Sequence, residues 1–489
     1  MTVSLVAIDQ GTTSTRAMRF GRDGSIQAVA ARELKQHYPQ AGWVEQDPED
    51  IWRDALATLR EVMAADVAAI GITNQRETIL LWDRATGRPL HNAIVWQDRR
   101  TADLCAALIA DGAEPMMRTK TGLLVDPYFS ATKLRWLLDN LPGARAAADR
   151  RELAAGTIDS FLLWRLTGGR VHATDATNAA RTALYDIVRD QWDDELLRLF
   201  GIPASLLPEV HPNAHIFGET DPAVAGRAIP IAGMAGDQQS ALIGQRCFAP
   251  GAIKSTYGTG CFLLANIGDA PLLSDKRLLT TTAYRIGNER AYAMEGSIFI
   301  AGAAIKWLRD RMGLIASAEE TAALAASVRA DHGVHLVPAF VGLGAPHWRS
   351  DVRAAITGIT LDTGPAEIAR AALEAVAFQT RDLIDAMAAA NMPQPSMIRI
   401  DGGMATNDWF AQFLADMLDV AVERPANHEC TALGAAFLAG VTIGIWPYHA
   451  ALDSLDSQAR RFEPAMLPAD RASALAGWRK ALDRTLMAS

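Results

Sequence analysis

The sequence predicts an α/β protein of two domains that follow one plan and enclose a ligand site between them. One observation is a pair of short turns rich in glycine and hydroxyl groups, DQGTTSTR at 9–16 and TYGTGC at 256–261, each placed between apolar strand-like segments. Such turns present backbone N–H groups and hydroxyls to an anion. The other observation is length, because 489 residues exceed the size at which one hydrophobic core stops growing.

The first part of the chain is expected to form a three-stranded meander followed by a helix. Apolar runs separated by turn residues predict these strands at 5–8, 17–20 and 26–30. Pro48 after Asp47 predicts a helix start, and apolar residues at helical spacing follow as far as Met63. A further strand is expected at 67–72.

The second half repeats this order. Strand-like segments at 252–255 and 261–267 flank the TYGTG turn, and a hairpin is expected around residues 287–288. A short strand at 397–400 precedes an Asp-Gly-Gly turn, after which Asn407 is placed to cap a helix.

Pro250 and Gly251 interrupt the pattern between the two halves. We therefore divide the chain into an N-terminal domain, 1–246, and a C-terminal domain, 247–489. No low-complexity linker separates them, so a close-packed hinge is expected. The apolar stretch 433–446 is too short for a membrane span and is interpreted as a buried helix.

Composition and charge restrict the class of protein and its expected partners. With 49% hydrophobic residues, 21% charged residues and a net charge of −9, the chain is typical of a soluble globular protein. It has no block of lysine and arginine that would bind nucleic acid, and its start lacks the pattern of a signal peptide. We expect a cytoplasmic protein with neither a nucleic acid nor a membrane partner.

The cysteines form no CxxC pair, which argues against a zinc site or a redox dithiol. We interpret them as buried thiols in a reducing compartment: Cys105, Cys247, Cys261 and Cys430. Neither the Walker motif GxxxxGK[ST] nor the Rossmann motif GxGxxG occurs at the glycine turns.

The two glycine turns and DGG at 401–403 together resemble the actin-like, sugar-kinase and Hsp70 superfamily. Further segments are similar to the FGGY carbohydrate kinases: YFSATKLRW at 128–136, GDQQ at 236–239, and AITGI at 355–359 leading into EIARAALE at 367–374. Within that family, NQRE at 74–77, DPYFSATK at 126–133 and STYGTGCF at 255–262 resemble the glycerol kinase branch. The resemblance extends from residue 8 to about residue 446.

This resemblance implies two actin-like (ribonuclease H-like) domains, each a mixed sheet flanked by helices, with ATP and substrate in the cleft between them. It implies an ATP- and Mg²⁺-dependent kinase that converts glycerol to sn-glycerol 3-phosphate, and a homo-oligomer of two or four chains. Two other interpretations are compatible with the residues alone. One is an FGGY kinase for erythritol, xylulose or ribulose, and the other is an actin-like ATPase that binds a protein.

The resemblance also assigns the phosphate side of the site. It implies that the β- and γ-phosphates are held by Thr12, Thr13, Ser14 and Arg16, and that Arg16 counters charge as the phosphoryl group departs. Asp9 ends an apolar strand, where an unpaired carboxylate is costly, so Mg²⁺ held through water is its expected partner. Without a bound phosphate or metal, residues 12–16 would be interpreted as a polar hairpin turn, and Asp9 as the residue that caps it.

On the acceptor side, the resemblance makes Asp237 the general base for the attacking hydroxyl, although it could also cap a helix that begins near Gln238. The implied ligands of the glycerol hydroxyls are Arg76, Glu77, Tyr128, Asp237 and Gln238, with Trp96 and Phe262 against the carbon edge. Without the surrounding motifs, Arg76 and Glu77 would be interpreted as an ion pair on the surface. Trp96 and Phe262 would be interpreted as residues of the hydrophobic core.

On the nucleotide side, the matching positions are Thr259, Gly302, Gly403 and Asn407. Glycine there lets the backbone approach a base or phosphate closely. Lys306 stands where many glycerol kinases have glutamine. Some bacterial relatives are inhibited by fructose 1,6-bisphosphate through an arginine in the loop before GDQQ. Here Ala228 takes that place and Arg227 lies one position away, so we expect no such inhibition.

Overall fold

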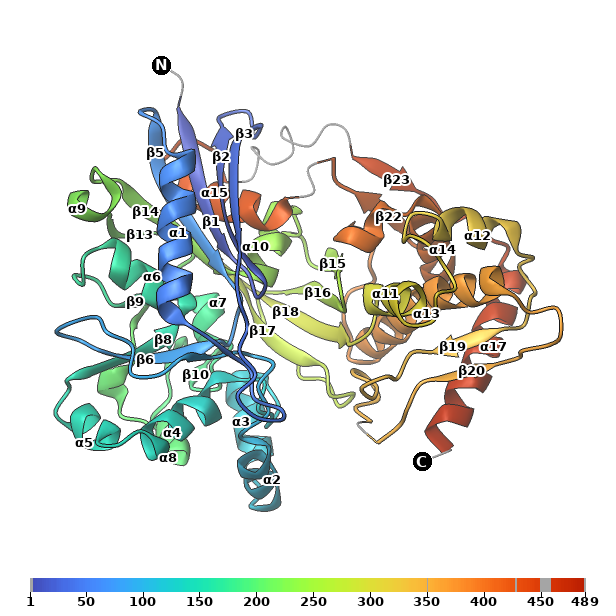
Figure 1. Ribbon diagram of the computed structural model, residues 1–489, viewed down its shortest axis with the longest axis horizontal. Coiled ribbons are helices and arrows are strands. Elements are labelled where there is room, and N and C mark those ends of the chain that lie inside the picture. Colours follow the sequence, from blue (N-terminus) through green and yellow to red (C-terminus); the bar gives the residue numbers. More distant parts are fainter. Residues whose placement is uncertain (1–2, 350, 427–428, 449–458, 488–489) are drawn as a thin grey trace.

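The computed structural model describes residues 3–349, 351–426, 429–448 and 459–487, which form two lobes side by side (Figure 1). The first lobe is built on a 6-stranded sheet with the order β13-β14-β5-β1-β2-β3. Its strands are β1 (Ser4–Gln10), β2 (Ser14–Gly21), β3 (Ile26–Glu33), β5 (Val67–Asn74), β13 (Ala214–Glu219) and β14 (Pro230–Gly236).

The second lobe contains a 7-stranded sheet with the order β17-β18-β16-β15-β21-β22-β23. Its strands are β15 (Ile253–Tyr257), β16 (Cys261–Gly268), β17 (Leu279–Ile286), β18 (Glu289–Ile298), β21 (Met397–Asp401), β22 (Ala421–Arg424) and β23 (Arg460–Phe462). The remaining strands form small sheets: β4 (Glu45–Gln46), β6 (Ile79–Asp83), β7 (Ala93–Ile94), β8 (Leu153–Thr157), β9 (Ala173–Asp175), β10 (Tyr185–Asp186), β11 (Gln191–Trp192), β12 (Glu209–His211), β19 (His335–Val337) and β20 (Ala355–Thr357).

The two sheets repeat one pairing pattern. From β3 across β2, β1, β5 and β14 to β13, the pairs are antiparallel, antiparallel, parallel, parallel and antiparallel. The same sequence of pairs runs from β18 across β16, β15, β21 and β22 to β23. The expected structural duplication is therefore present, with β17 as an added edge strand in the second sheet.

Helices cover the sheets. Those of the first lobe are α1 (Pro48–Val62), α2 (Ala102–Ala110), α3 (Glu114–Thr121), α4 (Ser130–Asn140), α5 (Ala144–Asp149), α6 (Ile158–Leu166), α7 (Ala176–Ala179), α8 (Asp194–Phe200), α9 (Pro222–Ala225) and α10 (Asp237–Gly244). Later in the chain follow α11 (Gly302–Asp310), α12 (Thr321–Ser327), α13 (Pro365–Ala389), α14 (Asp408–Leu418), α15 (Cys430–Thr442) and α17 (Pro468–Met487). No helix among these described residues is long and apolar enough to cross a membrane.

Strand β1 shows why the first sheet needs helices on both faces. Successive side chains of a strand point to opposite faces. Val6 and Ile8 pack in a buried cluster with residues of α1, whereas Leu5 and Ala7 pack in another with residues of α15. All four side chains are buried, so the apolar run of this strand is explained by burial on both sides.

The helices α10 and α15 cross closely beneath the first sheet, although they are far apart in the sequence. A Cβ atom on Gly434 would lie 1.9 Å from the Ser240 carbonyl oxygen, and one on Gly244 would lie 2.0 Å from the Cys430 carbonyl oxygen. Only glycine permits such an approach of two backbones. The segment of the chain after β22 thus packs against the sheet of the first lobe.

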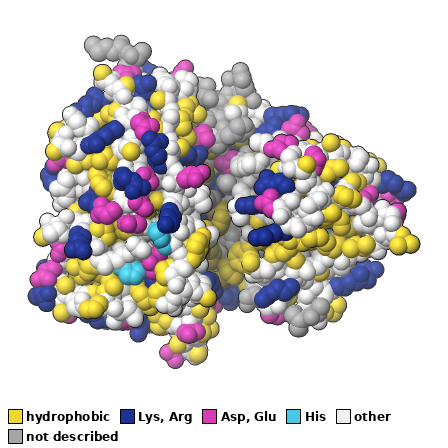
Figure 2. All heavy atoms as spheres, viewed as in Figure 1, with side chains coloured by type: hydrophobic (Ala, Val, Ile, Leu, Met, Phe, Trp, Pro, Cys, Tyr) yellow, Lys and Arg dark blue, Asp and Glu magenta, His cyan; other side chains and the backbone are white. Residues whose placement is uncertain are grey.

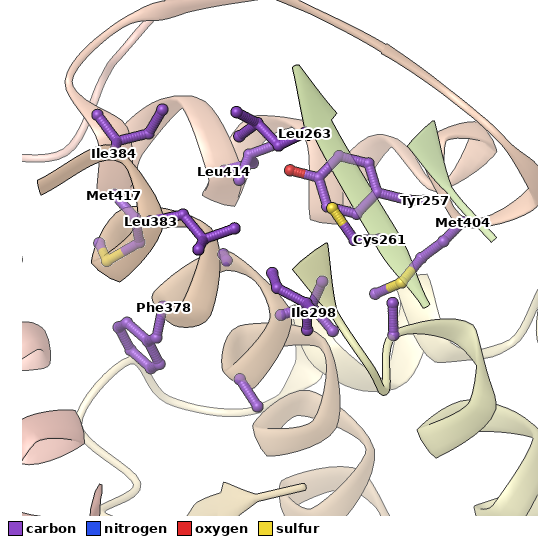
Figure 3. Packing of buried hydrophobic residues seen from close by; sticks show 14 of the residues in the cluster. Tyr257, Cys261, Leu263, Ile298, Phe378, Leu383, Ile384, Met404, Leu414 and Met417 are labelled. Carbon is purple, nitrogen blue, oxygen red and sulfur yellow. The ribbon is translucent and has the colours of Figure 1, made fainter. Parts of the chain in front are cut away.

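The core of the second lobe lies between its sheet and the helices α13 and α14. Figure 3 shows Leu263 and Ile298 from the sheet near Leu383 and Leu414 from these helices, all of them in one buried cluster. In the same cluster the Tyr257 hydroxyl lies 3.1 Å from Thr380 Oγ1 on α13. This packing fixes the strand that leads into the second glycine turn.

Local predictions are largely confirmed. The first helix begins at Pro48, and the Asp47 side chain accepts from the Glu49 N–H at 2.9 Å. Asn407 caps α14 by accepting from the Phe410 N–H at 3.0 Å. The helix expected over 433–446 instead spans Cys430–Thr442. It ends before Gly444, whose φ of 74° lies in the left-handed region that terminates helices.

Candidate active site

The parallel strands of the first sheet all end at one edge, and the predicted acceptor residues follow them. Gln10 of β1 and Gly236 of β14 both pair with Asn74 of β5. Arg76 therefore lies just beyond the end of β5, and Asp237 lies just beyond the end of β14. The carboxyl ends of parallel strands are the usual place for ligand sites in α/β sheets.

The first glycine turn is a tight connection between β1 and β2. The Gly11 N–H donates to the Ser14 carbonyl at 2.9 Å. Gln46 Nε2 donates to the Thr12 carbonyl at 2.6 Å, and Trp96 Nε1 donates to Thr12 Oγ1 at 3.0 Å. The backbone of this turn is thus held in place, while the neighbouring Thr13 is exposed.

Arg16 is bound by two carboxylates. Its Nη2 atom donates to Asp9 Oδ2 at 2.5 Å, and Nη1 donates to Glu429 Oε2 at 2.7 Å. Asp9 is only 4% exposed, and burial raises the pKa of its carboxyl group, opposed by the Arg16 charge. The predicted phosphate ligand and the predicted metal ligand therefore lie in direct contact, and Glu429 is an additional partner that the sequence did not reveal.

Arg76 and Glu77 are not a surface pair, because both side chains are buried. Arg76 Nη1 lies 2.6 Å from Glu295 Oε2, and its Nε lies 3.3 Å from Asp237 Oδ1. Its Nη2 donates to the Tyr128 hydroxyl at 3.4 Å. The structure thus brings together four of the predicted acceptor residues from three separate parts of the chain.

Asp237 is the first residue of α10, and its neighbour Gly236, rather than Asp237, occupies the capping position. Its carboxylate accepts from the Gln238 N–H at 2.7 Å. Burial raises the pKa of Asp237, while the charges of Arg76 and Lys254 oppose the rise. A carboxylate whose pKa is raised is a better proton acceptor than an exposed one.

The three predicted aromatic residues form one wall. The ring centroid of Trp96 lies 5.6 Å from that of Tyr128 and 6.1 Å from that of Phe262, both in edge-to-face arrangements. All three are only partly buried. They therefore meet at a surface rather than in a core, and the indole N–H of Trp96 joins this wall to the first glycine turn.

Three charged groups at this site were missed by the sequence analysis. Glu295 and Arg181 bind the predicted acceptor residues Arg76 and Glu77, and Lys254 Nζ donates to Gln238 Oε1 and, at 2.9 Å, to Thr256 Oγ1. Glu295 and Lys254 occupy buried positions of β18 and β15. A buried charge is costly unless it is paired, so a charged residue inside a predicted strand was the sequence feature that could have identified both residues.

The second glycine turn opens onto a cavity of about 680 Å³. The five predicted nucleotide residues all line it: Thr259, Gly302, Lys306, Gly403 and Asn407. The Gly302 N–H donates to the Gly258 carbonyl at 2.9 Å, and a Cβ atom at 302 would lie 2.7 Å from that oxygen. Figure 2 shows the hollow between the two lobes on this face of the molecule.

The residues at the phosphate side suit a magnesium ion that is shared with a phosphate group. Among the described ranges, no group of three or more His, Cys, Asp or Glu side chains could hold a metal by itself. Mg²⁺ needs no such group, because it usually takes one or two carboxylates together with waters and substrate phosphates. The buried carboxylate of Asp9, beside the first glycine turn, fits that role.

Arg227 is fully engaged elsewhere. Its guanidinium donates to the backbone carbonyls of Ala64 at 2.8 Å, Ala65 at 3.0 Å and Val67 at 2.8 Å. The side chain thereby ties the loop before β14 to the segment between α1 and β5. Both terminal nitrogens of Arg227 therefore already donate to the backbone.

Comparisons with known proteins agree with this geometry. The family model for the FGGY family of carbohydrate kinases, N-terminal domain, matches residues 4–244, and that for its C-terminal domain matches residues 253–443. A glycerol kinase of Gluconobacter oxydans (strain 621H) is 58% identical over 99% of this chain and 96% of that protein. One from Rhodospirillum centenum (strain ATCC 51521 / SW) is 58% identical over 98% of both chains.

Solved structures give the same picture. A crystal structure of Plasmodium falciparum glycerol kinase with ADP matches with a TM-score of 0.95 and 37% identity, covering 99% of this chain and 98% of that chain. A ligand-bound xylulose kinase from Lactobacillus acidophilus matches with a TM-score of 0.89 at 21% identity, covering 99% of this chain and 98% of that chain. The second match concerns the fold alone.

Proposed function

This chain belongs to the FGGY family of carbohydrate kinases, and from that premise we propose that it transfers the γ-phosphoryl group of ATP to glycerol. The products are ADP and sn-glycerol 3-phosphate. The observation that carries the proposal is the meeting of Arg76, Glu77, Tyr128 and Asp237 in one group beside the first glycine turn, in which Arg76 and Glu77 are buried. These residue types match a small polyol, which offers hydroxyl groups and a short carbon edge.

In the proposed complex, Arg76 donates to a glycerol hydroxyl and Glu77 accepts from one. Gln238 and the Tyr128 hydroxyl complete the polar contacts, while the wall of Trp96 and Phe262 covers the carbon edge. The burial of Arg76 and Glu77 makes the site more selective for glycerol, because an acceptor without matching hydroxyl groups would leave these buried polar groups unpaired.

Asp237 acts as the general base. A glycerol hydroxyl oxygen attacks the γ-phosphorus as the bond from that phosphorus to the β–γ bridging oxygen breaks, and its proton passes to Asp237. ADP leaves with the bond's electron pair. The loose transition state of phosphoryl transfer needs mainly alignment and charge neutralisation, so a carboxylate whose pKa is raised by burial is sufficient.

The phosphates of ATP are held by the first glycine turn, with Thr12, Thr13 and Ser14 as donors. Arg16 countercharges the phosphoryl group, and the γ-phosphate then competes with Glu429 for its guanidinium. Mg²⁺, when bound beside Asp9, would neutralise charge on the phosphate oxygens. The nucleoside occupies the cavity lined by Thr259, Gly302, Lys306, Gly403 and Asn407.

An acceptor panel tests the function. ADP release is measured with Mg-ATP and no acceptor, glycerol, erythritol, xylulose or ribulose. Strong stimulation by glycerol alone is the expected result. Stimulation by a longer polyol or a ketose instead would move the protein to another branch of the family, and hydrolysis that is indifferent to all acceptors would indicate an ATPase.

We also propose that the protein acts in the cytoplasm as a homo-oligomer of two or four chains. The four cysteines are all buried and none forms a disulfide in the described part of the chain, which is compatible with a reducing compartment. Light scattering coupled to size-exclusion chromatography measures the number of chains, and a mass equal to one chain would refute the oligomer.

A further inference from the structure

We propose that Glu295 and Arg181 are positioning residues that hold Arg76 and Glu77 in the geometry that binds the acceptor. The inference rests on the proposed function, because it concerns the same site. Its consequence is that the second lobe, which supplies Glu295, helps to hold the polar ligands of the acceptor, all of which belong to the first lobe.

Glu295 lies on β18 and binds two arginines at once. Its Oε2 atom accepts from Arg76 Nη1 at 2.6 Å, and its Oε1 atom accepts from Arg181 Nη2 at 2.9 Å. Arg76 Nη2 also lies 3.3 Å from Oε1. Both oxygens of this carboxylate are thus occupied by arginines of the first lobe.

Arg181 closes the group on its other side. Its Nε donates to Glu77 Oε1 at 2.6 Å, so Glu77 and Glu295 are bridged by one guanidinium. The guanidinium carbon also lies 5.5 Å from the ring centroid of Tyr128, within the range of a cation–π contact. Three predicted acceptor residues therefore depend on the two positioning residues.

The backbone of Glu77 needs such support. Its φ of 62° lies in the left-handed region, which is unfavourable for a residue other than glycine. The Thr78 N–H donates to the Arg76 carbonyl at 2.7 Å, and the Ser130 hydroxyl donates to the Glu77 carbonyl at 2.9 Å. These bonds and the Arg181 contact keep Glu77 in a conformation that it would otherwise leave.

Contacts within the group explain why both positioning residues act through others. Arg181 and Glu295 are buried, both oxygens of Glu295 accept from arginines, and Arg181 donates to Glu77 and Glu295. Two arginines beside Glu295 hold the pKa of its carboxyl group at about 2, although burial alone would raise it. Removal of this charge leaves two buried arginines with one carboxylate fewer, which is a strongly unfavourable arrangement.

The test compares Glu295→Gln with a matched control, Glu423→Gln. Glu423 also accepts from two arginines, Arg246 at 3.0 Å and Arg399 at 2.9 Å, but it lies on β22 away from the acceptor residues. Michaelis constants for glycerol and for ATP are measured for each variant. Glu295→Gln is expected to raise the KM for glycerol at least tenfold and to change the KM for ATP less than twofold.

Arg181→Lys provides a second variant, which keeps the positive charge and removes the guanidinium that donates to two carboxylates. It is expected to raise the KM for glycerol severalfold. The double variant Glu295→Gln/Arg181→Lys should raise this KM by less than the product of the two single factors, because the two residues bind each other and hold the same acceptor residues. Calorimetric binding of ADP, unchanged in each variant, verifies that the nucleotide cavity is folded.

Three results would overturn the inference. They are an unchanged KM for glycerol in both single variants, an equal rise in the KM for ATP, or the same rise in Glu423→Gln. If the wild-type enzyme prefers another acceptor, the proposed function fails, and the inference is judged by the KM for that acceptor. The two failures are therefore distinguishable.

Discussion

At the scale of the residue, burial gives carboxyl groups of one cleft different properties. Burial raises the pKa of Asp237 and of Asp9, whereas two arginines hold the pKa of Glu295 at about 2. Asp237 and Asp9 lie where the phosphoryl transfer is proposed, whereas Glu295 forms ion pairs with Arg76 and Arg181. The environment therefore separates the proposed proton acceptor, Asp237, and the proposed metal ligand, Asp9, from Glu295, whose carboxylate stays charged.

Asp237→Asn is expected to lower kcat by about 10²- to 10⁴-fold, because the amide keeps the shape of the side chain and cannot accept the proton. The KM for ATP should stay within about twofold, since the nucleotide cavity is untouched. Steady-state kinetics and a melting curve measure both effects. Retention of more than half of the wild-type kcat would exclude Asp237 as the base.

At the scale of the element, local chemistry was predictable and distant contacts were not. Helix starts were predicted correctly at Asp47 with Pro48 and at Asn407, because capping involves only neighbouring residues. Glu295 was missed because its arginine partner Arg76 is 219 positions away in the chain. The motif strings singled out the proposed acceptor residues, which the structure brings together, but no spacing in the sequence could show which residues hold them.

The crossing of α10 and α15 gives a second prediction. Gly434→Ala places a methyl group against the Ser240 carbonyl and should lower the free energy of unfolding by roughly 1–3 kcal/mol. Urea unfolding measures this change. Gly403→Ala is the control, because a Cβ atom there meets nothing within 4 Å. Equal stability of the two variants would show that the helices can separate without cost.

The loop before β14 gives a third prediction. Because Arg227 donates to three backbone carbonyls, we expect no inhibition by fructose 1,6-bisphosphate. ADP release at subsaturating glycerol is measured over a range of bisphosphate concentrations. A saturable fall in rate would mean that the compound binds at this loop or elsewhere, and Arg227→Ala would then distinguish the two places.

At the scale of the whole molecule, two copies of one sheet bring their strand ends to a common cleft. The carboxyl ends of β1, β5 and β14 carry the first glycine turn and the proposed acceptor residues, and those of β15 and β21 lead into the cavity proposed for the nucleotide. This plan was predictable because both halves repeat the same strand and turn pattern. Their contact through Glu295 links acceptor binding to the arrangement of the lobes.

Stability should also depend on pH through a carboxyl group outside the site. Asp159 is completely buried, and burial followed by repulsion from Asp175 raises its pKa to about 7. The folded protein therefore holds this proton more tightly than the unfolded chain does. The stability associated with the protonated form is fully present below the ordinary pKa of 3.8 and is lost as pH rises through about 7.

Asp159→Asn removes this dependence, because the amide stays neutral. The variant should gain stability relative to the wild type as pH rises from about 4 to 7, and the difference should be constant above that range. Urea unfolding at a series of pH values measures the difference. A difference that does not vary with pH would contradict the raised pKa.

Identification of the product tests most directly whether the protein phosphorylates glycerol. The enzyme is supplied with glycerol and ATP labelled in the γ-phosphate, and the labelled product is then offered to a dehydrogenase specific for sn-glycerol 3-phosphate. We expect the label to move from ATP to glycerol and the dehydrogenase to consume the product completely. Label recovered as inorganic phosphate, or on a different acceptor in preference to glycerol, would refute the proposed reaction.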